Sequence, residues 1–376
     1  IALLRLADGS SIEHGFRRLI PSVTNTGKLI AIAVLFAVMS AAAYGVIWAG
    51  YGLRFSAVPG QDQATLWFPQ TVTTPPGALY RFLHEHRLLP QAYLEGIHYA
   101  RSTLERECFL DGQNNPTWHG PAAGKIQRWP HYYLMTMLYK TPVPVLIFLV
   151  LAVGFSLGPG RKRLKRETPL LIASVMYLGS AIWSNMNIGH RLILPLVAML
   201  LIFAAKVVSD ERVKNTRPKG LWGLLLALLL AWHAGGTLAV YPHYLAYFNE
   251  PAGGPSNGAE HLTDSNIDWG QDLIELKRYM DRNGIPEVHF SYFGTADPRY
   301  YGIRCKFLEG DTIFKVEESE LSKGIGRGEW LAISVTNLKE TYAPLASFLS
   351  PVKQWNPTAK IGYSIYLYRS PTELIP

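Results

Sequence analysis

Between Leu29 and Leu53 the chain carries no charged side chain and is almost wholly apolar. About 20 mostly apolar residues are enough for an α-helix to cross the hydrocarbon core of a bilayer. The stretch from Leu29 to Gly50 therefore predicts a membrane span. Four later stretches predict further spans, which makes five in all: Thr141 to Gly158, Thr168 to Met186, Leu192 to Val208, and Gly220 to about Val240.

Basic residues flank these stretches in three clusters, and the clusters predict the orientation. Counted in alternation, all three fall on one side, as the positive-inside rule requires. They are Arg17, Arg18 and Lys28; Arg161, Lys162, Arg163, Lys165 and Arg166; and Lys206, Arg212, Lys214, Arg217 and Lys219. We expect a cytoplasmic segment at 1–28, a transmembrane domain at 29–240 with an outer loop at 51–139, and an extracytoplasmic domain at 241–376. Because much of the net charge of +8 sits in these loops, we expect no nucleic-acid partner.

The sequence after Tyr241 alternates helical and strand-like patterns, which predicts a small α/β domain with a partly parallel sheet. The expected elements are helices at Ile267 to Asp281 and Tyr342 to Leu349, and strands near His261, at Val288 to Phe293, Trp330 to Val335 and Ile361 to Tyr368. Ligands gather at the carboxyl ends of strands in such sheets. Polar residues follow three of these strands, and we expect them to converge on a pocket: Asp264 to Asn266, Gly294 to Asp297, and Thr336 with Asn337.

The outer loop has two further features. Its ends are rich in aromatic residues, which suit either the headgroup layer or the core of a small domain: Trp67, Phe68, Trp129, Tyr132, Tyr133 and Tyr139. The chain has only two cysteines, Cys108 and Cys305. One long-range disulfide and two free thiols are both compatible with that number.

The turn from Asn187 to Arg191 joins two predicted spans at the outer interface and ends in His190 and Arg191. Long basic side chains at helix ends reach the headgroups at little cost, so simple anchoring is one interpretation. The other is a binding site for a lipid phosphate, because the arginine fork matches two phosphate oxygens. Lys140 is a second cation at the same interface, and it either neutralises that phosphate or anchors its helix.

The segment from Asp264 to Glu275 allows two interpretations. Oxygen-bearing residues at Asp264, Asn266 and Asp268 match the spacing of a calcium loop, but Trp269 stands where such a loop needs glycine. Asp268 followed by Gln271 instead predicts a capping box at a helix start, which we favour. No metal or other cofactor is expected with certainty, and a divalent cation is the one left open.

Several strings resemble one family of membrane enzymes. In the membrane part these are Trp129-Pro-His-Tyr-Tyr133, Tyr139-Lys-Thr-Pro-Val-Pro144 and Gly189-His-Arg-Leu-Ile-Leu-Pro195. In the tail they are Tyr241-Pro-His-Tyr-Leu-Ala-Tyr-Phe-Asn249, Asp264-Ser-Asn-Ile-Asp-Trp-Gly-Gln-Asp272 and Ser291-Tyr-Phe-Gly-Thr-Ala-Asp-Pro298. Together they resemble the GT-C membrane glycosyltransferases, in particular the bacterial branch similar to protein O-mannosyltransferases and aminoarabinose transferases.

The resemblance implies a bacterial inner-membrane enzyme with a periplasmic carboxyl terminus. Such an enzyme transfers a sugar from a polyprenyl-phosphate donor to a protein or glycan acceptor, with inversion at the sugar carbon. It implies that Arg191, with His190 and Lys140, binds the donor phosphate. It also makes Tyr132, Tyr133, Asp264, Asn266 and Asp297 candidates for substrate binding. Leu192 departs from the aromatic residue common at that place in the family.

The general base of the family is an acidic residue in the first outer loop, and no stretch here matches that loop. We therefore expect this chain to be a carboxy-terminal portion, with the catalytic carboxylate upstream of it. The runner-up function is a membrane-anchored extracytoplasmic binding protein or sensor. A transporter is less favoured, because no predicted span carries an acidic residue or a broken-helix repeat.

Overall fold

The computed structural model describes residues 25–56, 77–102, 108–114, 129–157, 161–184, 186–209, 219–308, 318–342 and 345–375. The predictions made for Arg17, Arg18, Trp67 and Phe68 lie outside these residues, as do those for several basic loop residues. The chain divides into two compact units, Ile1–Glu105 and Arg106–Pro376, each of which is described by itself.

The first unit is built on α2 (Asn25–Gly50), the long apolar helix predicted from the uncharged stretch. Two shorter helices follow, α3 (Ala78–Glu85) and α4 (Gln91–Ser102). They are tied to the end of α2, because the Tyr44 hydroxyl donates a hydrogen bond of 2.8 Å to the carbonyl of Leu88. No residue in the apolar window of α2 is buried within the structure, which suits a helix surrounded by lipid.

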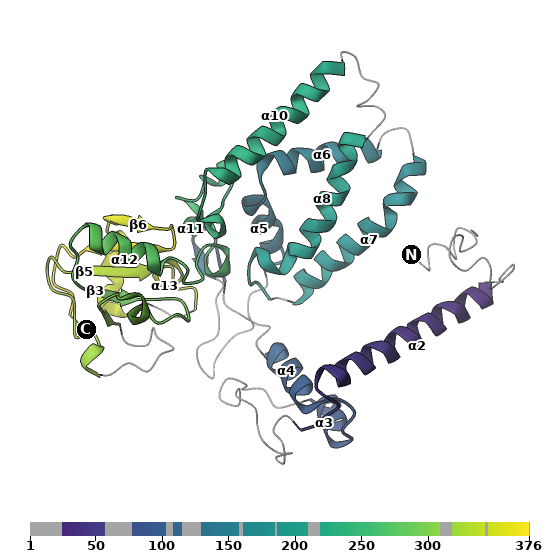
Figure 1. Cartoon of the computed structure of the whole chain (residues 1–376), viewed down its shortest axis with the longest axis horizontal. Helices are drawn as coiled ribbons and strands as arrows, with labels where there is room; N and C mark the ends of the chain where they lie inside the picture. The colour runs from purple at the N-terminus through teal and green to yellow at the C-terminus, as the bar shows by residue number, and fades with distance from the viewer. Residues whose placement is uncertain are drawn as a thin grey trace. The chain divides into compact units, whose positions relative to one another are not determined.

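The second unit begins with a small hairpin, β1 (Phe109–Leu110) and β2 (Gln113–Asn114), and continues with a group of helices (Figure 1). These helices are α5 (Tyr132–Lys140), α6 (Val143–Leu157), α7 (Arg161–Ser184), the 3-10 turn η1 (His190–Ile193) running into α8 (Leu194–Ser209), and α10 (Lys219–Leu238). Helices α6 and α8 pack together around a buried cluster of Ala152, Phe203 and Val207. An ion pair of 2.8 Å between Lys206 and Glu167 joins α8 to α7.

Three of the described helices are long and apolar enough to cross a membrane. They cover Leu29–Gly50, His190–Val208 and Gly220–Leu238, with mean hydropathies of 2.4, 2.3 and 1.6. The span predicted from Thr141 corresponds to α6, which has only 15 residues and passes as a span only together with α5. The two helices meet at an angle of 116°, because the ring of Pro142 disfavours a helical Thr141 between them. The predicted span from Thr168 lies within α7, whose first turns are basic. Five spans stay a prediction.

The tail forms a five-stranded sheet in the order β4-β3-β5-β7-β6. Its strands are β3 (Val288–Ser291), β4 (Cys305–Phe307), β5 (Trp330–Ser334), β6 (Ala359–Ile361) and β7 (Ile365–Arg369). Strand β3 is parallel to both β4 and β5, whereas β5, β7 and β6 pair antiparallel. The predicted partly parallel sheet is therefore confirmed.

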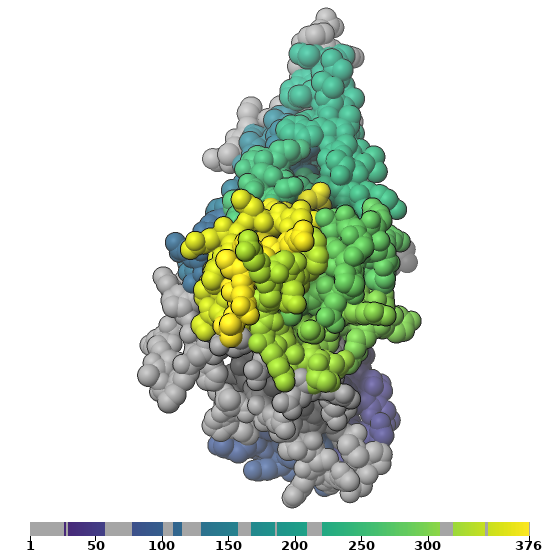
Figure 2. All heavy atoms as spheres, turned by 90° about the vertical axis from the view of Figure 1, so that its left-hand side faces the viewer, coloured from purple at the N-terminus to yellow at the C-terminus, as the bar shows by residue number. Residues whose placement is uncertain are grey.

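Helix α12 (Leu273–Arg282) covers one face of this sheet through its apolar stripe, Leu273, Leu276 and Met280 (Figure 1). In the space-filling view the yellow carboxy-terminal segment packs directly against the green segments before it (Figure 2). Short helical pieces make up most of the remaining connections: η2 (Tyr244–Ala246), η3 (Glu250–Ala252), α11 (Gly258–His261), η4 (Asp264–Asn266), η5 (Pro298–Tyr301), η6 (Glu318–Glu320), α13 (Val335–Leu338) and η7 (Ser347–Gln354).

Four predicted elements of the tail are wrong in detail. The helix expected from Ile267 begins only at Leu273, because Gly270 has a φ of 72° that no α-helix accepts. The residues near His261 form α11 and not a strand. The strand expected over Ile361 to Tyr368 is a hairpin that turns at Gly362 and Tyr363, both with positive φ. Of the helix expected over Tyr342 to Leu349, residues 343–344 lie outside the described residues, and its last three residues belong to the 3-10 segment η7.

Candidate functional site

The turn before α8 presents His190 and Arg191, and its backbone depends on Gly189. This glycine has φ 88° and ψ −173°, a conformation almost confined to glycine. A Cβ atom there would lie 2.7 Å from two side-chain atoms of Asn266. The turn therefore approaches the tail as closely as a residue without a side chain allows.

Asn266, which is only 1% exposed, is the residue on which the turn docks. Its amide oxygen accepts a hydrogen bond of 2.9 Å from the backbone N–H of His190. Its amide nitrogen donates to the carbonyl of Thr263 at 3.0 Å and to the Tyr132 hydroxyl at 3.4 Å. The neighbouring Ser265 hydroxyl donates to the carbonyl of Ile188 at 2.7 Å. Two segments 76 residues apart in sequence are thus held side by side.

Lys140, at the end of α5, joins the same docking contact. Its ammonium group donates to the carbonyl of Asn266 at 2.6 Å and to that of Leu245 at 2.8 Å. It also lies 4.4 Å from the centre of the Phe248 ring, a cation–π contact. The structure therefore brings together four of the predicted site residues: Tyr132, Lys140, His190 and Asn266.

Arg191 is exposed at the start of η1, and its guanidinium carbon lies 4.8 Å from the centre of the Trp269 ring. Asp264 lies close to this guanidinium group and is only 6% exposed. Burial raises the pKa of Asp264, while hydrogen bonds from Ser265 and Tyr342 and the charge of Arg191 act in the opposite direction. The ring atom Nδ1 of His190 is buried and has no hydrogen-bond partner among the described residues.

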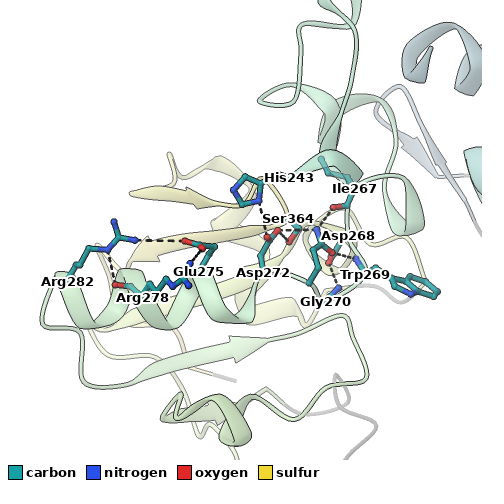
Figure 3. Close-up of polar contacts among 11 residues, drawn as sticks. His243, Ile267, Asp268, Trp269, Gly270, Asp272, Glu275, Arg278, Arg282 and Ser364 are labelled. Carbon is teal, nitrogen blue, oxygen red and sulfur yellow. Dashed lines mark hydrogen bonds and ion pairs between the residues drawn. The ribbon is translucent and has the colours of Figure 1, made fainter. Parts of the chain in front are cut away.

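Two further carboxyl groups, those of Asp268 and Asp272, follow Asp264 in the same segment, and both are buried (Figure 3). Asp268 accepts hydrogen bonds from the N–H groups of Gly270 at 3.2 Å and Thr336 at 3.4 Å. Burial raises the pKa of Asp268 to about 7. Asp272 accepts a hydrogen bond of 2.6 Å from Ser364, and its other oxygen is 3.3 Å from Nδ1 of His243. Burial raises the pKa of Asp272 as well.

The predicted capping box at Asp268 is wrong. The residue at the helix boundary is Asp272, and Asp268 instead closes a turn onto Gly270. Gln271 accepts a hydrogen bond from the N–H of Trp269 and does not reach back to Asp268. In the described part of the chain, no three His, Cys, Asp or Glu residues are placed to hold a metal ion. The calcium alternative also loses the Asn266 oxygen, which is taken by the His190 backbone.

Tyr133 and Asp297 lie apart from the Asn266 contact. The Tyr133 hydroxyl donates to the carbonyl of Met186, so it fixes the end of the segment that follows α7. Asp297 caps η5 and pairs with the Arg299 side chain at 2.8 Å, which lowers its pKa. Cys108 and Cys305 are both free thiols.

The polar strand ends meet in part. Thr336 lies in α13, two residues after β5. Its hydroxyl accepts a hydrogen bond from the backbone N–H of Asp264, and its own N–H donates to the Asp268 carboxyl. Asn337 donates to Ser291 at the end of β3. Trp269, His243 and Ser364 lie at this site but belong to no motif that predicts a site residue. For Trp269 the available signal was an aromatic residue within a run of polar ones.

Comparison with known proteins gives no match: no family model, no curated protein and no solved structure is similar to this chain.

Proposed function

We propose that the chain takes part in the transfer of a sugar from a polyprenyl-phosphate donor to an acceptor at the membrane surface. One observation carries the proposal: Arg191 exposes its guanidinium group at the end of the apolar helix that runs from His190 to Val208. A lipid whose tail lies along such a helix holds its phosphate at this level. A guanidinium fork suits that phosphate.

The proposal includes the finer topology: five spans, an outer loop at 51–139, and the tail at 241–376 in the periplasm of a bacterial inner membrane. Its support is the same-side placement of the basic clusters. In this arrangement Arg191 and the sheet domain lie on the outer side, where the donor phosphate is presented. The general base is not assigned to a residue of this chain.

Arg191 would stabilise the negative charge that develops on the departing lipid phosphate. Removal of one such donor costs about 10²- to 10³-fold in rate in comparable sites. Lys140 adds positive charge nearby, but two of its three N–H bonds are used by backbone carbonyls.

The test uses the full protein in membrane vesicles supplied with a panel of donors, polyprenyl-phosphate hexoses and polyprenyl-phosphate aminoarabinose, each tritiated in the polyprenyl chain. It measures the release of labelled polyprenyl phosphate. Arg191→Ala should reduce the release at least 100-fold, with unchanged membrane insertion. Arg191→Lys should recover only part of it, because an ammonium group cannot make the paired contact. Arg278→Ala is the matched control, since Arg278 is an exposed arginine that pairs with Glu275 on α12.

Release by Arg191→Ala equal to that of the unaltered protein would refute this assignment. Binding of a ligand by the sheet domain without any release would instead favour the sensor alternative.

A further inference from the structure

Three aromatic rings from separate segments form a cluster beside Arg191. The Trp269 and Phe293 rings are 6.2 Å apart, centre to centre, at an angle of 61°. The Phe293 and Tyr342 rings are 5.7 Å apart and stacked at 22°. Phe293 follows β3, and Tyr342 follows β5 and α13. The cluster therefore lies past the carboxyl ends of two parallel strands, where α/β sheets hold their ligands.

Trp269 is 55% exposed, although its backbone is firmly held. Its N–H donates to Gln271 at 2.7 Å, and the carbonyl of the next residue, Gly270, accepts a hydrogen bond of 2.9 Å from Tyr292. A Cβ atom on Gly270 would overlap the Tyr292 hydroxyl and would come within 2.9 Å of the Cα atom of Gly294. The loop thus presses against the end of β3 and holds a large apolar ring at the surface, an arrangement expected of a preformed binding surface.

One charged group lies at each end of the cluster. The Arg191 guanidinium lies over the Trp269 ring, and the carboxyl group of Asp264 accepts hydrogen bonds from Ser265 and Tyr342. A sugar ring has an apolar face of C–H bonds and a rim of hydroxyl groups. An aromatic surface with a few convergent polar groups matches both parts.

We propose that Trp269, Phe293 and Tyr342 form the surface that takes the sugar ring of a glycosyl phosphate whose phosphate is bound by Arg191. This inference rests on the proposed function and adds the residues that recognise the sugar. The phosphate of a glycosyl phosphate is attached directly to its sugar ring. A phosphate held by Arg191 therefore leaves its sugar within reach of Trp269, whose ring centre is 4.8 Å from the guanidinium carbon.

The competing explanation is that Trp269 is an interfacial anchor, since tryptophan gathers at lipid headgroups. An anchor accounts for one exposed ring. It does not account for a cluster that continues through Phe293 to Tyr342 and ends at a buried carboxyl group that Tyr342 bonds.

The test measures binding of glucose 1-phosphate, mannose 1-phosphate and inorganic phosphate to the full protein in lipid nanodiscs by line broadening in phosphorus NMR, which detects all three ligands. The unaltered protein should bind at least one hexose phosphate about tenfold more tightly than inorganic phosphate. Trp269→Ala should abolish this preference and leave phosphate binding unchanged, whereas Trp269→Phe should keep most of it. Tyr300→Ala is the matched control, because Tyr300 is 87% exposed in the same domain and lies outside the three-ring cluster.

Two results would overturn the inference: equal affinity for hexose phosphates and inorganic phosphate, or a preference that survives Trp269→Ala. Quenching of tryptophan fluorescence by brominated lipids that is lost in Trp269→Phe, without protection by hexose phosphate in the unaltered protein, would identify an anchor instead. In each of these cases Arg191→Ala still reports on the proposed function separately. Loss of phosphate binding in Arg191→Ala would support the phosphate site even when the proposed sugar surface is refuted.

Discussion

Replacement of Gly189 by alanine tests the contact between the turn before α8 and Asn266 of the tail. The backbone at Gly189, with φ 88° and ψ −173°, costs about 1–3 kcal/mol for any residue with a Cβ atom. The new methyl group would also lie 2.7 Å from side-chain atoms of Asn266. Asn266 is buried, so it can yield only by giving up hydrogen bonds, each worth about 0.5–1.5 kcal/mol. Together these effects predict a destabilisation of about 4 kcal/mol.

In nanodiscs this loss should lower the Tm, followed by intrinsic fluorescence, by roughly 10 °C. Gly284→Ala is the matched control, because Gly284 also has positive φ but has open space around its Cβ position. The double variant Gly189→Ala with Asn266→Ala should be less destabilised than the sum of the two single variants, because the overlap is gone. A Tm for Gly189→Ala no lower than that of Gly284→Ala, or strict additivity in the double variant, would refute this account of the contact.

Two further variants probe the buried carboxyl groups. The pKa of Asp268 is about 7 in the folded chain and near 3.9 in an unfolded one, so the folded state holds the proton more tightly. The stability that protonated Asp268 contributes to the folded state is fully present below about pH 4 and is lost as the pH rises to about 7. The stability of wild type relative to Asp268→Asn should therefore fall by up to roughly 4 kcal/mol over that range in denaturant titrations; a constant difference would contradict this. A methyl group at Gly362 would overlap the Asp272 carboxyl group, so Gly362→Ala should lower the Tm. The decrease should exceed that of Gly328→Ala, because Gly328 also has positive φ but has open space around its Cβ position. Equal shifts in Tm would show that Asp272 moves freely.

Local patterns in the sequence predicted two of the five strands, β3 and β5, close to their observed bounds. Val288 to Ser291 and Trp330 to Ser334 are short apolar runs bounded by polar residues, and both are strands of the sheet. The apolar stripe of Leu273 and Leu276 likewise predicted the buried face of α12. Such features succeed because burial of a helix stripe or strand face depends on neighbours that are close in sequence.

The helix boundary before Leu273 failed for a tertiary reason. Asp268 and Gln271 have the spacing of a capping box, but burial of Asp268 against Thr336 and the close approach of Gly270 to Tyr292 require a turn there. Thr336 and Tyr292 lie far along the sequence from Asp268 and Gly270, so no local pattern around these two residues includes them. The sequence did place Asn266 and His190 among the candidate residues, but it could not show that they bond each other across 76 residues.

The two cations predicted to bind a phosphate, Lys140 and Arg191, have different surroundings. Lys140 donates hydrogen bonds to the carbonyls of Asn266 and Leu245, and so joins the end of α5 to the tail. Arg191 begins the helix that this contact orients, and its guanidinium rests on Trp269 from the tail. Any ligand of Arg191 therefore meets residues from both parts of the second unit. It follows that a change at the docking contact should alter binding at Arg191 even when both Arg191 and Trp269 are intact.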